Sequence, residues 1–342
     1  MSEDDAGVAA PPDVPAIEIR GLTKRYGPVL AVDHLDLTVH GAETFALLGP
    51  NGAGKTTTVE CCGGFRAPDA GTVRVLGHDP RRDGHRLRPR VGMMLQEGGV
   101  YPLARPLEVL ELFARFHHDP LDPRAMLERV GLTEASRTRF RDLSGGQKQR
   151  LSLAMAVIGR PEVVFLDEPT AGLDPAARRL TWEHVRELRE DGVTVVLTTH
   201  LLDEAEALAD RVAIIDRGRL LALGTPDELT HTSRDELEFT TRESIDASAL
   251  SAHLGVDVVE VRPGRHHVHA ANDPALVARL TAWLADHDVR LGELQAGRRS
   301  LEDVFLALTG RSADELDELD ERGDAPDAHD EVDVHDTGAV SR

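Results

Sequence analysis

One stretch of the sequence has residue types and spacing that suit the binding of a phosphate group. It reads Gly49-Pro50-Asn51-Gly52-Ala53-Gly54-Lys55-Thr56 and follows a continuously apolar run at 44–48. Glycine lets the backbone turn tightly enough to point several N–H groups at one phosphate, and a helix beginning after the loop adds partial positive charge. Lys55 supplies a full charge, and the Thr56 hydroxyl can ligate Mg²⁺. Strand, loop and helix together predict a nucleotide-binding loop rather than a chance glycine-rich turn.

Two adjacent carboxylates follow a second apolar stretch. Asp167 and Glu168 come directly after Val163–Leu166, which is typical of a buried strand. Carboxylates in such a place are costly unless a cation or a water network compensates them. Asp167 therefore suits the outer coordination sphere of Mg²⁺, and Glu168 suits orienting and deprotonating an attacking water. The alternative, a merely polar strand end, is weak beside the upstream phosphate loop.

Gln96 and His200 also end predicted strands, at 91–95 and 193–199. Ligands of α/β sheets bind at the carboxyl ends of the strands, so both residues are expected at the edge that carries Lys55 and Glu168. Gln96 could hold a metal-bound water, or it could simply start a loop. A lone His at a strand end is usually structural, but one that shares this edge is expected to contact the γ-phosphate.

A second candidate anion site is Leu143-Ser144-Gly145-Gly146-Gln147, which precedes a long predicted helix. One nucleotide needs only one phosphate loop, so a second such corner suggests a nucleotide held between two chains. Taken alone, the same residues could serve only as a helix cap. Tyr26, in a predicted turn at 24–28, is either a platform for a nucleotide base or a half-buried residue that closes a small sheet.

The elements that must position these residues alternate between strand and helix. We expect a leader without fixed structure at 1–15, an α/β domain at 16–232 with a helical insert at about 105–157, and an acidic unstructured tail at 313–342. Between them, residues 235–310 form a smaller domain. Its order of strand, helix, strand, strand, helix and strand predicts a ferredoxin-like unit, and one more helix follows it.

Composition limits the possible partners. The chain has 342 residues and a net charge of −21, which fits about two domains and argues against binding to nucleic acid or to an anionic lipid surface. Any membrane attachment must therefore come from a protein contact. The only cysteines, Cys61 and Cys62, are adjacent, which fits a reducing cytosol, and we find neither a signal peptide nor an apolar run of the roughly 20 residues that a span needs.

Taken in order, these motifs resemble the nucleotide-binding subunits of ATP-binding-cassette (ABC) transporters. The residues that carry the resemblance, which covers about 17–232, are Gly49–Thr56, Gln96, Leu143–Gln147, Val163–Glu168, Asp174 and His200. It implies an α/β phosphate-loop ATPase core with an antiparallel β subdomain and a helical insert. It also implies that two copies face head to tail around two ATP, that Ser144–Gln147 of each closes the other's loop, and that Tyr26 stacks on adenine.

Residues and resemblance together assign roles to individual positions. Catalysis is assigned to Glu168, His200, Lys55 and Gln96, and Mg²⁺ binding to Thr56, Gln96 and Asp167. ATP binding is assigned to Tyr26, Gly49, Pro50, Asn51, Gly52, Ala53, Gly54, Lys55, Thr56, Thr57, Ser144, Gly145, Gly146, Gln147 and Asp174. A soluble cassette acting on DNA or ribosomes is the rival class, but the single cassette and the negative charge disfavour it. A nucleotide sensor without hydrolysis would require the loss of Glu168 or Ser144.

The C-terminal part narrows the expected function. Ser300-Leu301-Glu302-Asp303-Val304-Phe305 is similar to a segment of the daunorubicin-resistance type of exporter ATPase, in which the membrane channel is a separate polypeptide. We therefore expect a Mg²⁺-dependent ATPase that forms a homodimer and powers a separate permease exporting drugs or antibiotic-like compounds. It is expected at the cytoplasmic side of the cell membrane as a peripheral subunit, touching the membrane only through the permease and binding no nucleic acid.

Overall fold

The computed structural model describes residues 15–95, 99–230, 237–242, 245–270, 273–296 and 300–310, without the side chains of 295 and 296. Almost all of the expected leader and the whole expected acidic tail lie outside the described residues, as does Gln96. Within the described ranges, no helix combines the length and the apolar character that crossing a membrane requires. Residues 15–230 are called the core unit below, and residues 237–296 the C-terminal unit.

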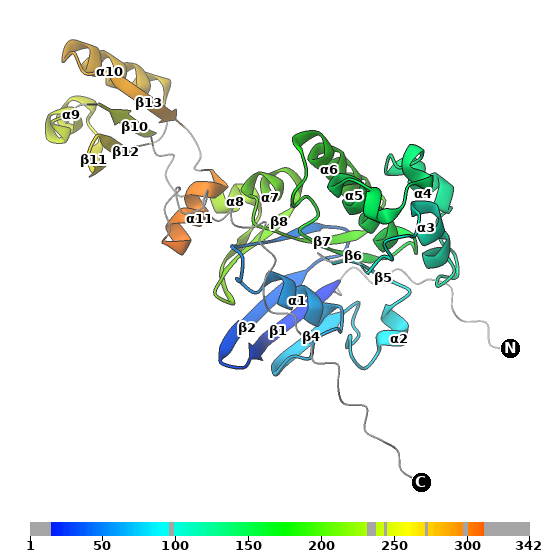
Figure 1. Ribbon diagram of the computed structural model, residues 1–342. Coiled ribbons are helices and arrows are strands. Elements are labelled where there is room, and N and C mark those ends of the chain that lie inside the picture. Colours follow the sequence, from blue (N-terminus) through cyan, green and yellow to red (C-terminus); the bar gives the residue numbers. More distant parts are fainter. Residues whose placement is uncertain are drawn as a thin grey trace, which may run out of the picture.

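A six-stranded sheet organises the core unit (Figure 1). Its strands, in the order β5-β6-β7-β3-β8-β9, are β5 (Val91–Met94), β6 (Val163–Asp167), β7 (Thr194–Thr199), β3 (Thr44–Leu48), β8 (Arg211–Asp216) and β9 (Arg219–Gly224). Only the β8–β9 pair is antiparallel. Every residue of β3, β6 and β7 is buried, and the apolar runs at their centres predict parallel strands covered on both faces. The carboxyl ends of these strands therefore share one edge.

Alternate side chains of each central strand enter two different cores. In β6, Val164 and Leu166 pack among the helices on one face of the sheet. Val163 and Phe165 pack on the other face, against α1 (Lys55–Cys62) and a second, three-stranded sheet. That sheet is antiparallel, in the order β2-β1-β4, with β1 (Ile17–Tyr26), β2 (Val29–Val39) and β4 (Ala70–Val75). The period of two along a strand produces this division.

The remaining helices of the core unit follow the predicted pattern, with one difference. They are α2 (Gly84–Leu87), α3 (Pro106–Ala114), α4 (Pro123–Arg129), η1 (Glu134–Arg137), η2 (Phe140–Asp142), α5 (Gly145–Val157), α6 (Pro175–Glu190), α7 (Leu202–Leu208) and α8 (Pro226–Thr230). The helical insert expected at about 105–157 thus contains α3 to α5. Val109 of its first helix is buried, but Leu112 and Phe116, which share its helical spacing, are exposed by 52% and 74%.

The C-terminal unit has the predicted order of elements. It contains β10 (Leu237–Thr241), α9 (Ala247–Leu254), β11 (Asp257–Arg262), β12 (Arg265–His269), α10 (Pro274–Asp286) and β13 (Leu291–Ala296). The sheet order is β11-β12-β10-β13, and every neighbouring pair is antiparallel. Its own apolar core includes Phe239 and Trp283 and shares no residue with the core unit. Figure 1 shows this unit standing beside the core unit, near α8 and α11.

Helix α11 (Leu301–Thr309) packs on the core unit, although the sequence analysis grouped it with residues 235–310. The side chains of Leu301 and Phe305 are buried in the same apolar core as α7 and the central sheet. The Leu301 N–H also donates a hydrogen bond to Glu206 Oε1 on α7 at 2.8 Å. The chain therefore leaves the core unit after α8, forms the C-terminal unit, and returns to the core unit with α11.

This return contact should stabilise the core unit measurably. We expect Leu301→Ala to lower its free energy of unfolding by about 2–4 kcal/mol, because the change leaves a cavity in a packed core. Leu308→Ala is the matched control, since Leu308 lies on the same helix but is 41% exposed. Urea unfolding in a Trp283→Phe background isolates the core unit, because Trp182 is then the only tryptophan. Equal effects of the two alanine variants would contradict the packing role of α11.

Candidate functional site

The phosphate loop lies between the carboxyl end of β3 and the first residue of α1. Two glycines of this loop lie where a residue with a Cβ would not fit. Gly54 has φ +100°, and a Cβ there would lie 2.4 Å from the Ala31 carbonyl oxygen. A Cβ on Gly49 would lie 2.3 Å from the Ile215 carbonyl oxygen. The close approach of β2 and β8 to the loop, together with the left-handed backbone before α1, therefore requires glycine at both positions.

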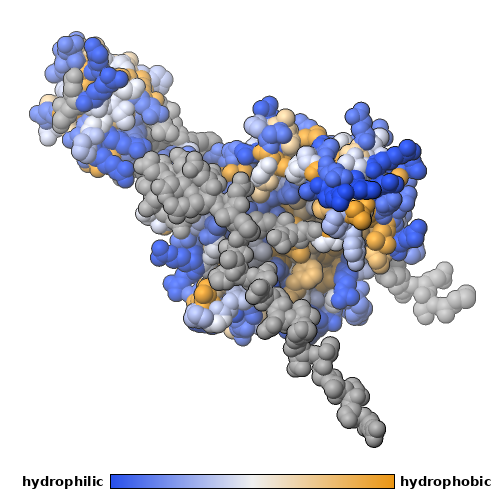
Figure 2. All heavy atoms as spheres, in the orientation of Figure 1, coloured by the Kyte–Doolittle hydropathy of each residue, from blue (hydrophilic) through white to orange (hydrophobic). Residues whose placement is uncertain are grey.

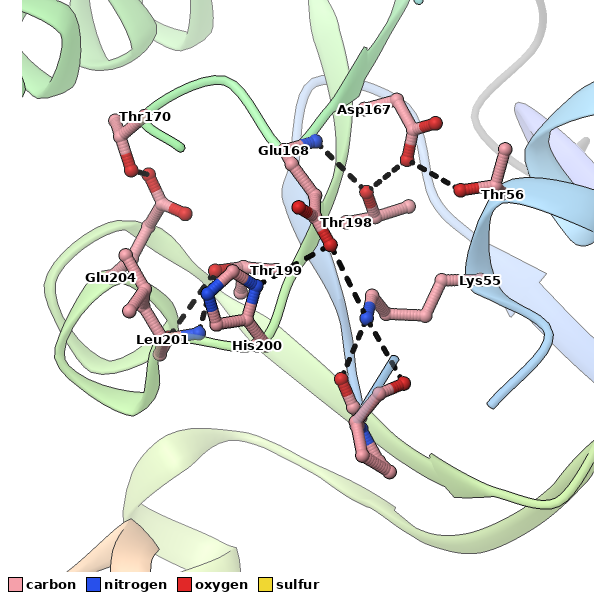
Figure 3. Close-up of polar contacts among 12 residues, drawn as sticks. Lys55, Thr56, Asp167, Glu168, Thr170, Thr198, Thr199, His200, Leu201 and Glu204 are labelled. Carbon is pink, nitrogen blue, oxygen red and sulfur yellow. Dashed lines mark hydrogen bonds and ion pairs between the residues drawn. The ribbon is translucent and has the colours of Figure 1, made fainter. Parts of the chain in front are cut away.

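Lys55 turns its ammonium group back into this loop (Figure 3). Its Nζ donates hydrogen bonds to the carbonyl oxygens of Gly49 at 2.7 Å and Pro50 at 3.2 Å. It also lies 3.5 Å from Glu168 Oε1. The side chain is buried, and this burial lowers the pKa of Lys55 although the nearby charges of Glu168 and Asp167 oppose the shift. A cation is thus held where a phosphate would replace its present partners.

Asp167, the last residue of β6, has one carboxylate oxygen occupied and one without a partner. The hydroxyls of Thr56 and Thr198 both donate hydrogen bonds to Oδ1 of Asp167. The distance from Thr56 Oγ1 to this oxygen is 3.2 Å. Oδ2 is buried and accepts no hydrogen bond from the described residues. Burial raises the pKa of Asp167 against the effect of these hydroxyls. A hydroxyl and an uncompensated carboxylate side by side are oxygen ligands of the kind that Mg²⁺ prefers, so the donor set fits this ion.

Glu168 follows in a backbone conformation that is rare outside glycine, with φ +47°. Hydrogen bonds hold it on both sides: its N–H donates to Thr198 Oγ1 at 3.0 Å, and its carbonyl accepts from Gln149 Nε2 at 3.0 Å. Its carboxylate Oε1 lies 3.4 Å from His200 Nδ1. Burial alone would raise the pKa of Glu168, but the hydrogen bond from His200 and the charge of Lys55 outweigh it and hold that pKa below its usual value.

Five of the predicted site residues therefore meet at one edge of the sheet: Lys55, Thr56, Asp167, Glu168 and His200. The sequence analysis missed Thr198 and Gln149, which bind the two carboxylate residues. Thr198 could have been found, because the parallel register of β6 and β7 pairs it with Asp167. No sequence pattern points to Gln149, because it binds the backbone carbonyl of Glu168 and not a side chain.

The second predicted corner is separate from this edge within one chain. Ser144 and Gln147 cap α5 reciprocally: Ser144 Oγ accepts from the Gln147 N–H, and Gln147 Oε1 accepts from the Ser144 N–H. Asp174 caps α6 in a similar way, accepting from two backbone N–H groups at 2.9 Å. Ser144, Gly145 and Asp174 are all exposed. These helix ends are thus open to solvent.

Tyr26 does not lie in a turn as predicted, because β1 extends further than its alternating sequence suggested. It is the last residue of β1 and pairs with Val29 across the two-residue turn of Gly27 and Pro28. The ring is 39% exposed. The cationic groups of Lys24 and Arg66 lie 5.5 Å and 5.8 Å from its centroid, and each is also paired with a carboxylate, Asp69 and Glu60 respectively.

Comparison with known proteins identifies the family of this chain. Residues 32–171 match the family model described as ABC transporter. The daunorubicin resistance ATP-binding protein DrrA3 of Streptomyces coeruleorubidus is 40% identical, over 86% of this chain and 96% of its own length. The Nod factor export ATP-binding protein I of Ralstonia nicotianae is 38% identical, over 87% of this chain and 94% of its own length. The chain belongs to the ABC transporter family as an ATP-binding subunit.

A solved structure supports the fold of this ABC subunit. The dimeric structure of MJ0796, a bacterial ABC transporter cassette, matches with a TM-score of 0.56 and 24% identity over 61% of this chain and 98% of its own. The core unit is therefore an ABC cassette, with the antiparallel β subdomain that the resemblance implied. ABC subunits of this kind bind ATP and hydrolyse it to power transport, and their cassettes dimerise and pair with permeases.

The low pKa of Glu168 predicts how the stability of the nucleotide-free protein depends on pH. The ionised carboxylate stabilises the fold above the unfolded-chain value of roughly 4.3, and this contribution is lost as pH falls through the lower folded pKa. Glu168→Gln lacks this contribution. The difference in unfolding free energy between wild type and variant should therefore hold steady above about pH 5 and shrink below it. Urea titrations across that range measure it, and a difference independent of pH would contradict the pairing with Lys55 and His200.

Proposed function

We propose that this protein is the Mg²⁺-dependent ATPase subunit of an exporter for drugs or antibiotic-like compounds. The observation that carries the proposal is the meeting of Lys55, Asp167, Glu168 and His200 at one edge of the sheet. Export is supported by the names of the relatives, which concern daunorubicin resistance and Nod factor export. The protein acts at the cytoplasmic side of the cell membrane, as a peripheral subunit bound to a separate permease.

The chemistry is positioning and electrostatic stabilisation. Thr56 and Asp167 would hold Mg²⁺, with Gln96 as a further ligand from outside the described residues; the ion supplies positive charge that neutralises the phosphate oxygens. Lys55 exchanges its two carbonyl partners for phosphate oxygens. Glu168 is ionised at neutral pH because its pKa is low, and it orients the attacking water. His200, in contact with Glu168, senses the γ-phosphate.

A homodimer completes the nucleotide site in this proposal. Ser144–Gln147 and Asp174 lie at the N-terminal ends of α5 and α6, where the partial positive charge suits phosphate, and their capping hydrogen bonds stay within these helix ends. A second copy, facing head to tail, brings these residues to the Lys55 loop. Bound ATP also supplies a reason for two strongly acidic chains to associate, since each nucleotide is held by both. Tyr26 stacks on the adenine ring.

We also propose the division of the chain. Residues 16–232 form the cassette together with α11, and the accessory domain expected at 235–310, which is of ferredoxin-like type, ends before Leu301. The order βαββαβ and the antiparallel sheet order β11-β12-β10-β13 support that classification, because the split βαβ motif places its first and third strands at the centre of the sheet.

The permease docks on the helical insert in this proposal. Two exposed apolar residues precede α3, Tyr101 at 83% and Leu103 at 62%, and Leu112 and Phe116 continue the apolar surface on and just after that helix. Figure 2 shows apolar residues among hydrophilic ones in the region of α3. Exposed apolar groups gathered in this way mark contact sites. They also fit a chain whose negative charge disfavours direct binding to lipid.

Glu168→Gln tests the proposed catalysis. We expect turnover of Mg²⁺-ATP to fall roughly 10²–10⁴-fold, because the neutral amide cannot act as a base, while ATP binding is retained. The variant should also accumulate as an ATP-bound dimer in size-exclusion chromatography. Glu183→Gln, an exposed carboxylate on α6, is the control for the loss of one charge. Full activity of Glu168→Gln would remove the proposed base.

Phe116→Glu tests the docking surface. The purified wild-type protein should not bind protein-free anionic liposomes. It should bind proteoliposomes that contain the permease encoded with it. The variant should lose most of this binding, by about 10-fold or more, because a charge is placed in an apolar contact. Its ATP affinity should not change. Tight binding of the wild type to the protein-free liposomes would contradict attachment through a protein.

A further inference from the structure

A buried carboxyl group lies behind the site, and none of the roles above uses it. Glu204 belongs to α7, four residues after His200, and its side chain is only 1% exposed. Its Oε1 accepts hydrogen bonds from Thr170 Oγ1 at 2.8 Å and from Trp182 Nε1 at 3.1 Å. The Thr199 hydroxyl, at the end of β7, accepts a hydrogen bond from the Leu201 N–H at the start of the turn into α7. Figure 3 shows Glu204 with Thr170 on one side and the turn that carries His200 on the other.

Each partner of Glu204 belongs to a segment that carries a residue of the site. Thr170 follows Glu168 by two positions in the loop after β6. The other partner, Trp182, lies on α6, the helix that Asp174 caps. Glu204 itself lies on α7, four residues after His200. One carboxyl group therefore connects the segments of the catalytic pair, without contacting either member of that pair.

Glu168 needs such support because its backbone is strained. A positive φ in a residue with a Cβ costs free energy and persists only where the surroundings fix it. Thr198 and Gln149 fix the peptide groups on either side of Glu168. Beyond them, the Thr170 bond to Glu204 anchors the loop that follows. His200 is held similarly, since the Leu201 N–H donates to Thr199 Oγ1 at 2.9 Å.

The chemistry of this site also favours a positioning role over a contribution to stability. Thr170 and Trp182 are neutral, and burial raises the pKa of Glu204. A buried carboxyl group without a basic neighbour stabilises a fold less than an apolar side chain of similar volume would. Its advantage lies in directional hydrogen bonds to several segments at once, which an apolar side chain cannot make.

We propose that Glu204 is a positioning residue for ATP hydrolysis: from α7, which directly follows His200, its hydrogen bond from Thr170 fixes the loop after Glu168 relative to the turn that carries His200. The proposal rests on the catalytic roles proposed above for those two residues. Glu204 acts through them and does not touch the nucleotide, so its loss affects the hydrolytic step and not ATP binding.

Steady-state ATPase measurements on the full-length protein test this. Glu204→Ala should lower kcat by about 10–100-fold, because small misplacements of catalytic groups have effects of this size, and should leave ATP affinity within about twofold. Glu204→Gln should recover most of kcat, since the amide oxygen still accepts from Thr170 and Trp182. Val185→Ala removes a buried side chain of α6 from the core and is the control for a general loss of packing. A kcat of Glu204→Ala equal to that of Val185→Ala would overturn the proposal.

A double variant shows whether Glu204 acts through Glu168. In a Glu168→Gln background, Glu204→Ala should reduce the residual turnover by less than about twofold, because residues that act as a unit are not additive. Full additivity of the two changes would overturn the proposal while leaving the proposed function intact. Full activity of Glu168→Gln alone would instead overturn the proposed function, and with it the route by which Glu204 acts.

Milder variants remove single donors and keep the fold. Thr170→Val and Trp182→Phe each delete one hydrogen bond to Glu204; the first keeps the shape of the side chain, and the second keeps an aromatic ring of smaller size. Thr170→Val should lower kcat several-fold with unchanged ATP affinity, and it should add little to Glu204→Ala. Trp182→Phe should have the smaller effect, because α6 carries neither Glu168 nor His200. Wild-type kcat in Thr170→Val would overturn the proposal independently of the Glu204 variants.

Discussion

The cost of holding carboxylates away from water at the end of β6 governs this structure. Asp167 and Glu168 are both buried at a sheet edge, where a bare carboxylate is unfavourable. Two different solutions lie side by side. Asp167 accepts from two hydroxyls and keeps one oxygen without a hydrogen bond, whereas Glu168 is compensated by Lys55 and His200. Burial raises the pKa of Asp167, whereas the hydrogen bond from His200 and the charge of Lys55 outweigh burial and lower the pKa of Glu168.

The contacts of Lys55 also show why this lysine can remain buried. Its ammonium group is bound by carbonyl oxygens of the phosphate loop and by Glu168, all of which can be exchanged for phosphate oxygens. In the proposed mechanism, binding of a nucleotide therefore trades one set of hydrogen bonds for another and does not have to strip water from an exposed charge. The same exchange would withdraw the positive charge that compensates Glu168, so the proposal couples nucleotide binding to the basicity of this carboxylate.

Local sequence was sufficient for most of the site because its elements follow simple rules. The apolar runs of β3 and β6 mark buried parallel strands, and such strands bring their last residues to one edge, which is how Lys55, Asp167, Glu168 and His200 could be grouped. The acceptor role of the Glu168 carbonyl and the path of α11 could not be predicted in this way. Both depend on packing between segments far apart in the sequence, and periodicity carries no information on which face of one helix meets another.

The exposed side chains of the helical insert show a related limit. A helical period in Val109, Leu112 and Phe116 predicts a common apolar face, but a period does not say whether that face meets a core or a partner. Here the first residue enters the core and the other two remain at the surface. The same applies to Ser144 and Gln147: their reciprocal capping accounts for the sequence pattern within one chain, and any role across a dimer lies outside what a single chain can reveal.

The path of the chain around the C-terminal unit makes that unit an insertion and not an appendage. Because α11 returns to the cassette, the unit is inserted in the chain between α8 and α11. Closing such a loop costs little more for a long insert than for a short one. Related chains could therefore exchange this unit for others of different size while their cassettes stay intact.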